Sequence, residues 1–191
     1  KGKRMLKKYY LRFLPTAKID YIFLFTLYDL ADYDTETKTY SIITYKSLTE
    51  LSRICSVSDK TLRRHLADTE YSPFLRWEKQ NKRVILLNDF SKTGNKTPFL
   101  TVSPEEVRIL YAENDNLLCK YLIYLKYYCG YSATKRIDTT CNQFLSAIGY
   151  SSNSSYPSKI SGYNALLEQK GILKIERKHD ERGYLRNVYS F

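Results

Sequence analysis

The amino-acid sequence predicts an α+β fold, mainly helical, because one arrangement of helices and strands occurs twice along the chain. Each copy consists of a short amphipathic helix, a turn, a second helix and two strands joined by a charged hairpin. The first copy runs from Thr44 to Phe90 and the second from Thr139 to Phe191. In a chain rich in Lys and Arg, this repetition indicates two tandem winged helix-turn-helix domains.

Length and composition agree with two folded domains and a polyanionic partner. A chain of 191 residues is long enough for two compact domains. Hydrophobic residues make up 43% of it, and it has only 7 Gly and 5 Pro, as expected of a folded chain. The 31 basic residues outnumber the 20 acidic ones. The resulting charge of +11 favours nucleic acid over an acidic small molecule as the partner.

We expect a basic N-terminal arm over residues 1–12, a first domain over 13–96 and a second over 97–191. Residues 91–98 lack apolar periodicity and predict the linker. The arm carries six cations and no acid: Lys1, Lys3, Arg4, Lys7, Lys8 and Arg12. Such a tail either lies along phosphates or is merely solvated.

The first domain is expected to open with a helix that packs in the core. Residues 17–31 place apolar side chains at helical spacing and predict one wide apolar face. A short strand is expected over 40–44. The next short helix puts Leu48, Leu51 and Ile54 on one face.

A second helix and a hairpin complete this domain. Ser58 is a suitable N-cap for a helix over 59–68. This helix and the short helix before it form the expected helix-turn-helix. Strand-like runs at 74–78 and 83–87 flank the polar residues 79–82. This hairpin is the expected wing.

The second domain repeats this order. A strand is expected over 99–102, and Ser103 followed by Pro104 predicts the start of a helix that reaches Glu113. A second amphipathic helix is expected to end near Gly130. Beyond it we expect three more elements: a helix over 139–148, a helix over 156–170 and a hairpin that turns at 179–183.

The first recognition helix is expected to present a basic face. With Leu62 and Leu66 directed into the core, Lys60 and Arg64 point away from it, and Thr61 and Arg63 lie on the flanks. A helix with this face fits the major groove, where Lys and Arg bind guanine edges or phosphates. The alternative is an ordinary solvated helix face.

The second recognition helix is expected to present a small, nearly uncharged face. Ile160, Tyr163 and Leu167 are expected to point into the core. Opposite the core lie Ser158, Ser161, Gly162 and Ala165, with Lys159 and Asn164 near the edges. Such a face allows either close approach to a DNA groove or packing on another protein.

Seventeen residues of the arm, the recognition helices and the wings are expected to contact DNA. They are Lys3, Arg4, Lys7, Lys8, Lys60, Thr61, Arg63, Arg64, Lys79, Lys82, Ser158, Lys159, Ser161, Arg177, Lys178, Arg182 and Arg186.

Enzyme chemistry, metal binding and cofactor binding have little support in the sequence. The four cysteines, Cys55, Cys119, Cys129 and Cys141, form no C-x-x-C pair and are expected to be core thiols. The two histidines belong to no metal or catalytic motif, and no phosphate-binding glycine loop is present. We therefore expect a protein that is not an enzyme and has no cofactor. Because the sequence shows no membrane span and no signal peptide, we also expect it to be cytoplasmic.

Residues Leu166–Lys178, which read LLEQKGILKIERK, and Asn187–Val188–Tyr189 resemble the third helix and wing of winged-helix proteins in plasmid and phage replication. The tandem layout is similar to that of plasmid replication initiators, a family in which both domains bind repeated sites at a replication origin. MarR-like transcription regulators share the same helix end and basic wing. The close similarity covers about the last fifty residues, and the first copy matches by layout alone.

This resemblance implies a sequence-specific double-stranded DNA-binding protein that initiates replication of a plasmid, phage or mobile element. The implied partners are DNA with repeated sites, replication proteins and a second copy of the chain, but no membrane. Two other functions stay open: a winged-helix transcription regulator, and a replisome or partition adaptor in which one winged helix binds protein.

Overall fold

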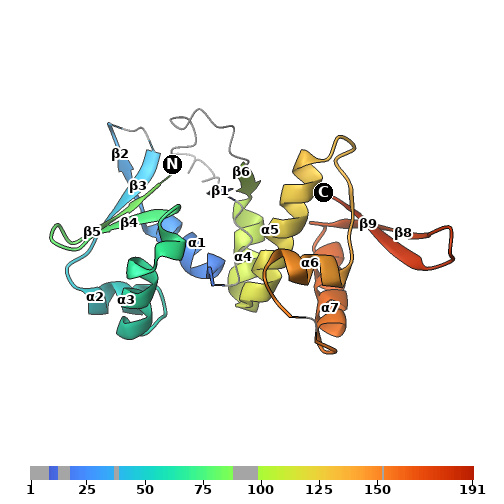
Figure 1. The fold of residues 1–191 in the computed structure, drawn as a ribbon. Coiled ribbons are helices and arrows are strands. Elements are labelled where there is room, and N and C mark those ends of the chain that lie inside the picture. The colour runs from blue at the N-terminus through green and yellow to red at the C-terminus, as the bar shows by residue number, and fades with distance from the viewer. Residues whose placement is uncertain (1–8, 13–17, 37–38, 88–98, 152) are drawn as a thin grey trace.

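The computed structural model describes residues 9–12, 18–36, 39–87, 99–151 and 153–191 (Figure 1). This part of the chain contains seven α-helices, one short 3-10 helix and nine strands. All the strand pairs are antiparallel and form sheets of two, four and three strands. The predicted α+β class is confirmed.

The first half contains the four-stranded sheet, whose strand order is β2-β3-β5-β4. Its elements are α1 (Tyr21–Leu30), β2 (Asp32–Asp34), β3 (Thr39–Thr44), α2 (Leu48–Ile54), α3 (Asp59–Ala67), η1 (Thr69–Tyr71), β4 (Leu75–Glu78) and β5 (Arg83–Leu86). Helix α1 begins four residues later than the pattern predicted. Its start is set by Asp20, whose side chain accepts a 3.1 Å hydrogen bond from the N–H of Phe23.

The second half has the three-stranded sheet, in the order β7-β9-β8. Its elements are β6 (Phe99–Val102), α4 (Pro104–Glu113), α5 (Asn116–Tyr131), β7 (Ile137–Asp138), α6 (Cys141–Ala147), α7 (Tyr156–Gln169), β8 (Lys174–His179) and β9 (Leu185–Ser190). Capping boxes start two of these helices. Ser103 pairs reciprocally with Glu106 at α4, and Thr140 does so with Gln143 at α6.

The two halves share one topology. In each, a helix, a strand, two helices and a hairpin follow one another, and the last strand lies between the other two. The order β3-β5-β4 in the first half therefore corresponds to β7-β9-β8 in the second. Strand β2, at the edge of the first sheet, has no counterpart and was not expected from the sequence.

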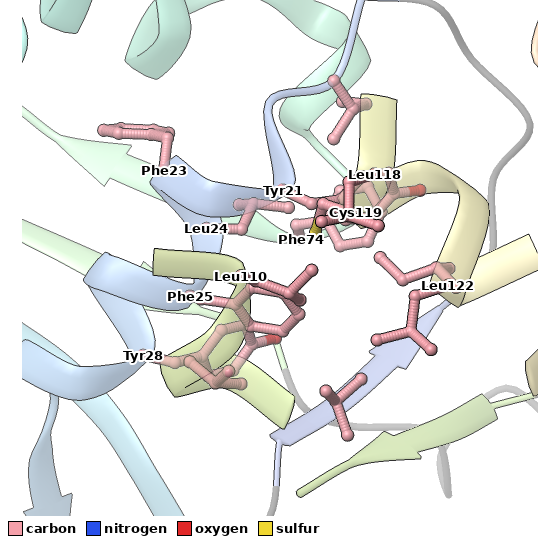
Figure 2. Close-up of a cluster of buried hydrophobic side chains, with 14 of the residues drawn as sticks. Tyr21, Phe23, Leu24, Phe25, Tyr28, Phe74, Leu110, Leu118, Cys119 and Leu122 are labelled. Atoms are coloured by element: carbon pink, nitrogen blue, oxygen red, sulfur yellow. The ribbon is translucent and has the colours of Figure 1, made fainter. Parts of the chain in front are cut away.

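The halves are joined by a continuous hydrophobic core. Helix α1 packs against α4 and α5 of the second half. Figure 2 shows Phe25 of α1 near Leu110 of α4, and Tyr21 of α1 near Leu118 of α5. Six of the ten residues of α1 are buried, and at 100° per residue they occupy one continuous arc of the helix, so the expected wide apolar face is confirmed. Ile22 and Leu30 lie off this arc and are only half-buried.

A two-stranded sheet also connects the ends of the first half. Strand β1 (Tyr9–Arg12) pairs with β6, with Tyr9 opposite Val102 and Arg12 opposite Phe99. The arm expected over 1–12 thus contains a paired strand, and this pairing was not foreseen. The proposed boundary between residues 96 and 97 and the linker at 91–98 lie outside the described residues.

Two side chains differ from the pattern expected on their helices. Ile54 is 48% exposed rather than inward, because it ends the short helix α2 and Cys55 takes the buried place beside it. Asn164 is buried rather than at the edge of an outer face. Its amide accepts a 2.8 Å hydrogen bond from Tyr121 and donates to Tyr189 at 3.3 Å. These partners satisfy a polar group inside the core.

All four cysteines are free thiols. Three of them, Cys55, Cys119 and Cys129, are buried as predicted, whereas Cys141 is half-buried. Burial raises the pKa of Cys55 and of Cys129 to about 11, so both stay protonated at neutral pH.

Candidate nucleic-acid interface

The start of α3 is fixed by hydrogen bonds from the preceding turn and from α2. The Ser58 hydroxyl accepts a 3.1 Å bond from the N–H of Thr61 and donates to the Thr61 hydroxyl at 2.9 Å. The carboxylate of Asp59 accepts from the hydroxyl of Thr49 at 2.8 Å and from that of Ser52. These two hydroxyls lower the pKa of Asp59, which therefore remains an anion that ties α2 to α3.

The inward side of α3 packs on α1. Leu62 and Leu66 are buried as predicted, and His65 joins them. The His65 ring lies 4.8 Å from the ring of Phe23 and 5.0 Å from that of Tyr71, measured between centroids. Desolvation lowers the pKa of His65, which favours the neutral imidazole. The helix is thus held by this buried face and, at its first turn, by the bonds of Asp59 to α2.

The opposite side of α3 is a cationic surface. Lys60, Arg63 and Arg64 are exposed, as their positions on the helix predicted, and Thr61 is half-exposed. None of the three cations forms an ion pair with an acid in the described part of the chain. Their charges face solvent and are available to a polyanion.

The β4–β5 hairpin, which the sequence predicts to be the first wing, carries two further lysines. Lys79 and Lys82 are exposed at the hairpin turn, and the Lys79 ammonium lies 5.9 Å from the centre of the Trp77 ring. Two nearby arginines share one carboxylate, since Glu78 pairs with Arg83 and, at 3.3 Å, with Arg76. The hydrogen bond from Arg83 is the main cause of the lowered pKa of Glu78. Glu78 neutralises one of these two positive charges, and the lysines of the hairpin, which form no ion pair in the described ranges, lie at its tip.

Helix α7 presents a different surface. Ser158, Lys159 and Ser161 are exposed as expected. Beside them Gly162 is exposed, and a Cβ built on it would have no atom within 4 Å. Ala165 is exposed too. Lys159 is the one cation on this outer face, which is otherwise small and neutral.

Most of the expected cations of the second wing are engaged in ion pairs. Arg177 binds both carboxylate oxygens of Glu168 on α7, at 2.8 and 3.3 Å. Lys178 pairs with Glu176 at 2.8 Å, and Arg186 pairs with Asp180 at 3.1 Å. Arg182 is the exception: it is exposed and forms no ion pair within the described ranges.

The arm residues Lys3, Arg4, Lys7 and Lys8 lie outside the described residues. The remaining predicted positions form two groups rather than one. Figure 1 shows α3 at the lower left and α7 at the lower right, with the β4–β5 and β8–β9 hairpins extending to opposite sides. The first group is strongly cationic and the second is nearly neutral.

Sequence reasoning missed three exposed side chains near these groups. Arg53, in the last turn of α2, lies beside the turn that leads into α3. Tyr184 and Leu185 are exposed by 67% and 60% at the tip of the second wing. The signal for this pair was present, since two large apolar residues directly follow the turn residue Gly183.

A groove of about 550 Å³ lies between α1, the α2–α3 turn and the α4–α5 turn. Its two carboxylates already have partners, because Asp20 caps α1 and Asp29 accepts a 2.7 Å bond from Tyr111. No group of three or more His, Cys, Asp or Glu side chains in the described ranges is placed to hold a metal ion. Both acids of the groove thus serve the fold in the described part of the chain.

No protein-family model, curated protein or solved structure was found to match the chain. Within the ranges that the structure describes, no helix combines the length and the apolar character that crossing a membrane requires.

Proposed function

We propose that the chain is a sequence-specific double-stranded DNA-binding protein made of two tandem winged helix-turn-helix domains. The observation that carries this proposal is the position of the cations on α3. Lys60, Arg63 and Arg64 project from α3, the helix that would enter the major groove if the first half acts as a winged helix.

In this proposal α3 reads the DNA and the first wing holds it. Lys60 and Arg64 stand opposite the buried Leu62, so they would face the groove floor, where Arg binds guanine through two hydrogen bonds. Lys79 and Lys82 at the hairpin tip would contact the phosphates of the flanking backbone. The anchoring of α3 through Asp59 and His65 limits the entropy lost on binding.

The biological role that we propose is the initiation of replication of a plasmid, phage or mobile element. It rests on the similarity of the last fifty residues and of the tandem layout to replication initiators. The packing of α1 on α4 and α5 supports it, because two joined modules can bind neighbouring sites with a high effective concentration. A transcription regulator would use the same DNA surface at a promoter.

The neutral face of α7 favours a second candidate function, that of an adaptor. Ser158, Ser161, Gly162 and Ala165 offer little charge to a phosphate backbone but allow close packing of another protein. In this case the first half binds DNA and the second half binds a protein of the replication or partition machinery.

Sequencing of the genomic DNA fragments retained by the purified full-length protein tests these functions. Enrichment of iterated repeats would support an initiator, and enrichment of a single promoter palindrome would support a regulator. Binding by the first half alone, with no contribution of the second to the footprint, would favour the adaptor. If no fragment is enriched, sequence-specific binding is refuted.

A further inference from the structure

We infer that the tip of the β8–β9 hairpin binds unpaired DNA bases, with Tyr184 as the stacking platform. The inference rests on the proposed DNA-binding function and adds a second type of site to it. The observation behind it is the large exposure of Tyr184 and Leu185 at the end of a projecting hairpin. Figure 1 shows this hairpin reaching beyond the helices of the second half.

The tip is held in one conformation by Asp180. One carboxylate oxygen accepts bonds from the N–H groups of Arg182 and Tyr184, both at 2.9 Å, and the other accepts from Arg186 at 3.1 Å. The Asp180 backbone N–H also donates to the Tyr184 carbonyl at 2.9 Å. These bonds lower the pKa of Asp180 and keep it charged. The backbone that carries Tyr184 is therefore ordered before any ligand arrives.

Gly183 completes this turn with a φ of +79°, a backbone conformation that residues with a Cβ rarely adopt. Its N–H donates a 2.8 Å bond to the Asp180 carbonyl. The two residues that flank this glycine, Arg182 and Tyr184, are both exposed.

The charges of the tip cancel, which argues against phosphate as its main ligand. Asp180 offsets Arg186 through their ion pair, and Glu181 offsets Arg182 in sign. What remains is an aromatic ring, an apolar neighbour and one guanidinium. A tyrosine ring stacks on any base, and the planar guanidinium of Arg182 beside it can lie against a base as well.

Unpaired bases fit this tip better than an intact duplex does. Inserting an apolar side chain between paired bases requires unstacking, whereas bases in a melted segment are already accessible. The hairpin directly follows α7 in the chain. If the second half is bound to DNA, the hairpin tip would therefore lie close to a DNA strand. The site would therefore capture a strand where the duplex opens.

The test uses the full chain and three DNA probes: a single-stranded 20-mer, the matching duplex, and the duplex with an internal unpaired bubble. We expect Y184A to weaken binding to the single strand and to the bubble by about tenfold, in the range found for loss of one base–aromatic stack. Y184F should bind as tightly as the wild type. Y131A, which removes another exposed tyrosine, is the matched control.

Stacking itself is read from 2-aminopurine in the unpaired segment, whose fluorescence falls when the base stacks. Wild type and Y184F should quench it, and Y184A should not. Equal affinity and equal quenching by Y184A and wild type would overturn the inference. A changed self-association or protein binding of Y184A with unaltered DNA binding would overturn it as well, in favour of a protein site.

The duplex probe separates this inference from the proposed function. Retained duplex binding by Y184A, together with weakened single-strand binding, would support both. If the wild type binds the single strand through Tyr184 but binds no duplex, the proposed function fails and the tip site stands.

Discussion

Asn116 Oδ1 accepts a 3.0 Å hydrogen bond from the backbone N–H of Tyr21, and so joins the first turn of α5 to the first turn of α1. The same amide donates to the carbonyl of Ile19 at 3.1 Å. One side chain from the second half thus satisfies two backbone groups of the first half, as a neighbouring peptide would. The two halves are linked by directional bonds in addition to apolar packing.

We expect N116A to lower the free energy of unfolding by about 1–3 kcal/mol, because it leaves a part-buried N–H and C=O without their partner. Denaturant unfolding followed by circular dichroism measures this change. Q169A removes an exposed amide at the end of α7 and should stay within about 0.5 kcal/mol of the wild type. An equal effect of the two substitutions would show that the Asn116 bridge contributes nothing.

Removal of the outward cations of α3 should weaken specific DNA binding without loss of fold. R64A should cost about 1–3 kcal/mol on the preferred site if Arg64 binds a base edge, and should relax the sequence preference there. The double variant K60A/R64A should lose more binding free energy than R64A alone. Titration of labelled duplex measures these losses, and unchanged melting temperatures exclude unfolding.

The matched control for R64A is R108A, which removes one exposed arginine from α4 and alters the net charge by the same amount. It should leave affinity for the specific site nearly unchanged. If R108A weakens binding as much as R64A does, the effect comes from net charge, and α3 does not read the DNA.

Stability should fall as the pH drops through the histidine range. The folded-state pKa of His65 is lowered, first by burial and then by Arg64, while Asp20 and Asp68 oppose this. Because the unfolded chain, with a histidine pKa of about 6.5, binds the proton more readily, the stabilising contribution is complete above that pH. It decreases as the pH falls from about 6.5 toward the folded-state pKa.

Denaturant unfolding at pH 5, 6, 7 and 8 measures this dependence. H65F keeps the ring contacts with Phe23 and Tyr71 and should flatten the curve over this range. H179Q changes the exposed histidine on β8 and should leave the curve unchanged. A wild-type slope retained in H65F would assign the pH dependence to other groups.

The arm should affect the salt dependence of DNA binding more than its specificity. Deletion of residues 1–8 should reduce the slope of log affinity against log salt by about 0.9 for each phosphate that these residues neutralise. Deletion of 1–12 would also remove β1 and its pairing with β6, so the shorter deletion isolates the charge. Affinity measured at four salt concentrations gives the slope, and an unaltered slope would mean that the arm binds no phosphate.

Local signals in the sequence were sufficient for most of the helices and for both hairpins. Ser58 and Ser103 act as N-caps where the residue pattern places the helix starts, and Leu62 and Leu66 are buried as the spacing requires. These features depend on residues within a few positions of one another. They can therefore be predicted without knowledge of the tertiary structure.

Long-range features were not predictable in this way. The pairing of β1 with β6, the bridge from Asn116 to Tyr21 and the ion pair between Arg177 and Glu168 each depend on how distant elements meet. Charge counting assigned Arg177 to DNA because a sequence does not show which acid lies nearby. The burial of Asn164 could have been predicted, because Asn164 lies one helical turn after the inward-facing Ile160.

The antiparallel pairing of β1 with β6 places Arg12 opposite Phe99, so the backbone leaves and rejoins the second half at one point. In chain path the first half is an inserted domain, and a two-residue turn from Arg12 to Phe99 would bypass it as a simple hairpin. In packing it is not separable, because α1 covers apolar side chains of α4 and α5. Excision of the first half would keep the connectivity of the remaining chain but expose that apolar surface to water and to aggregation.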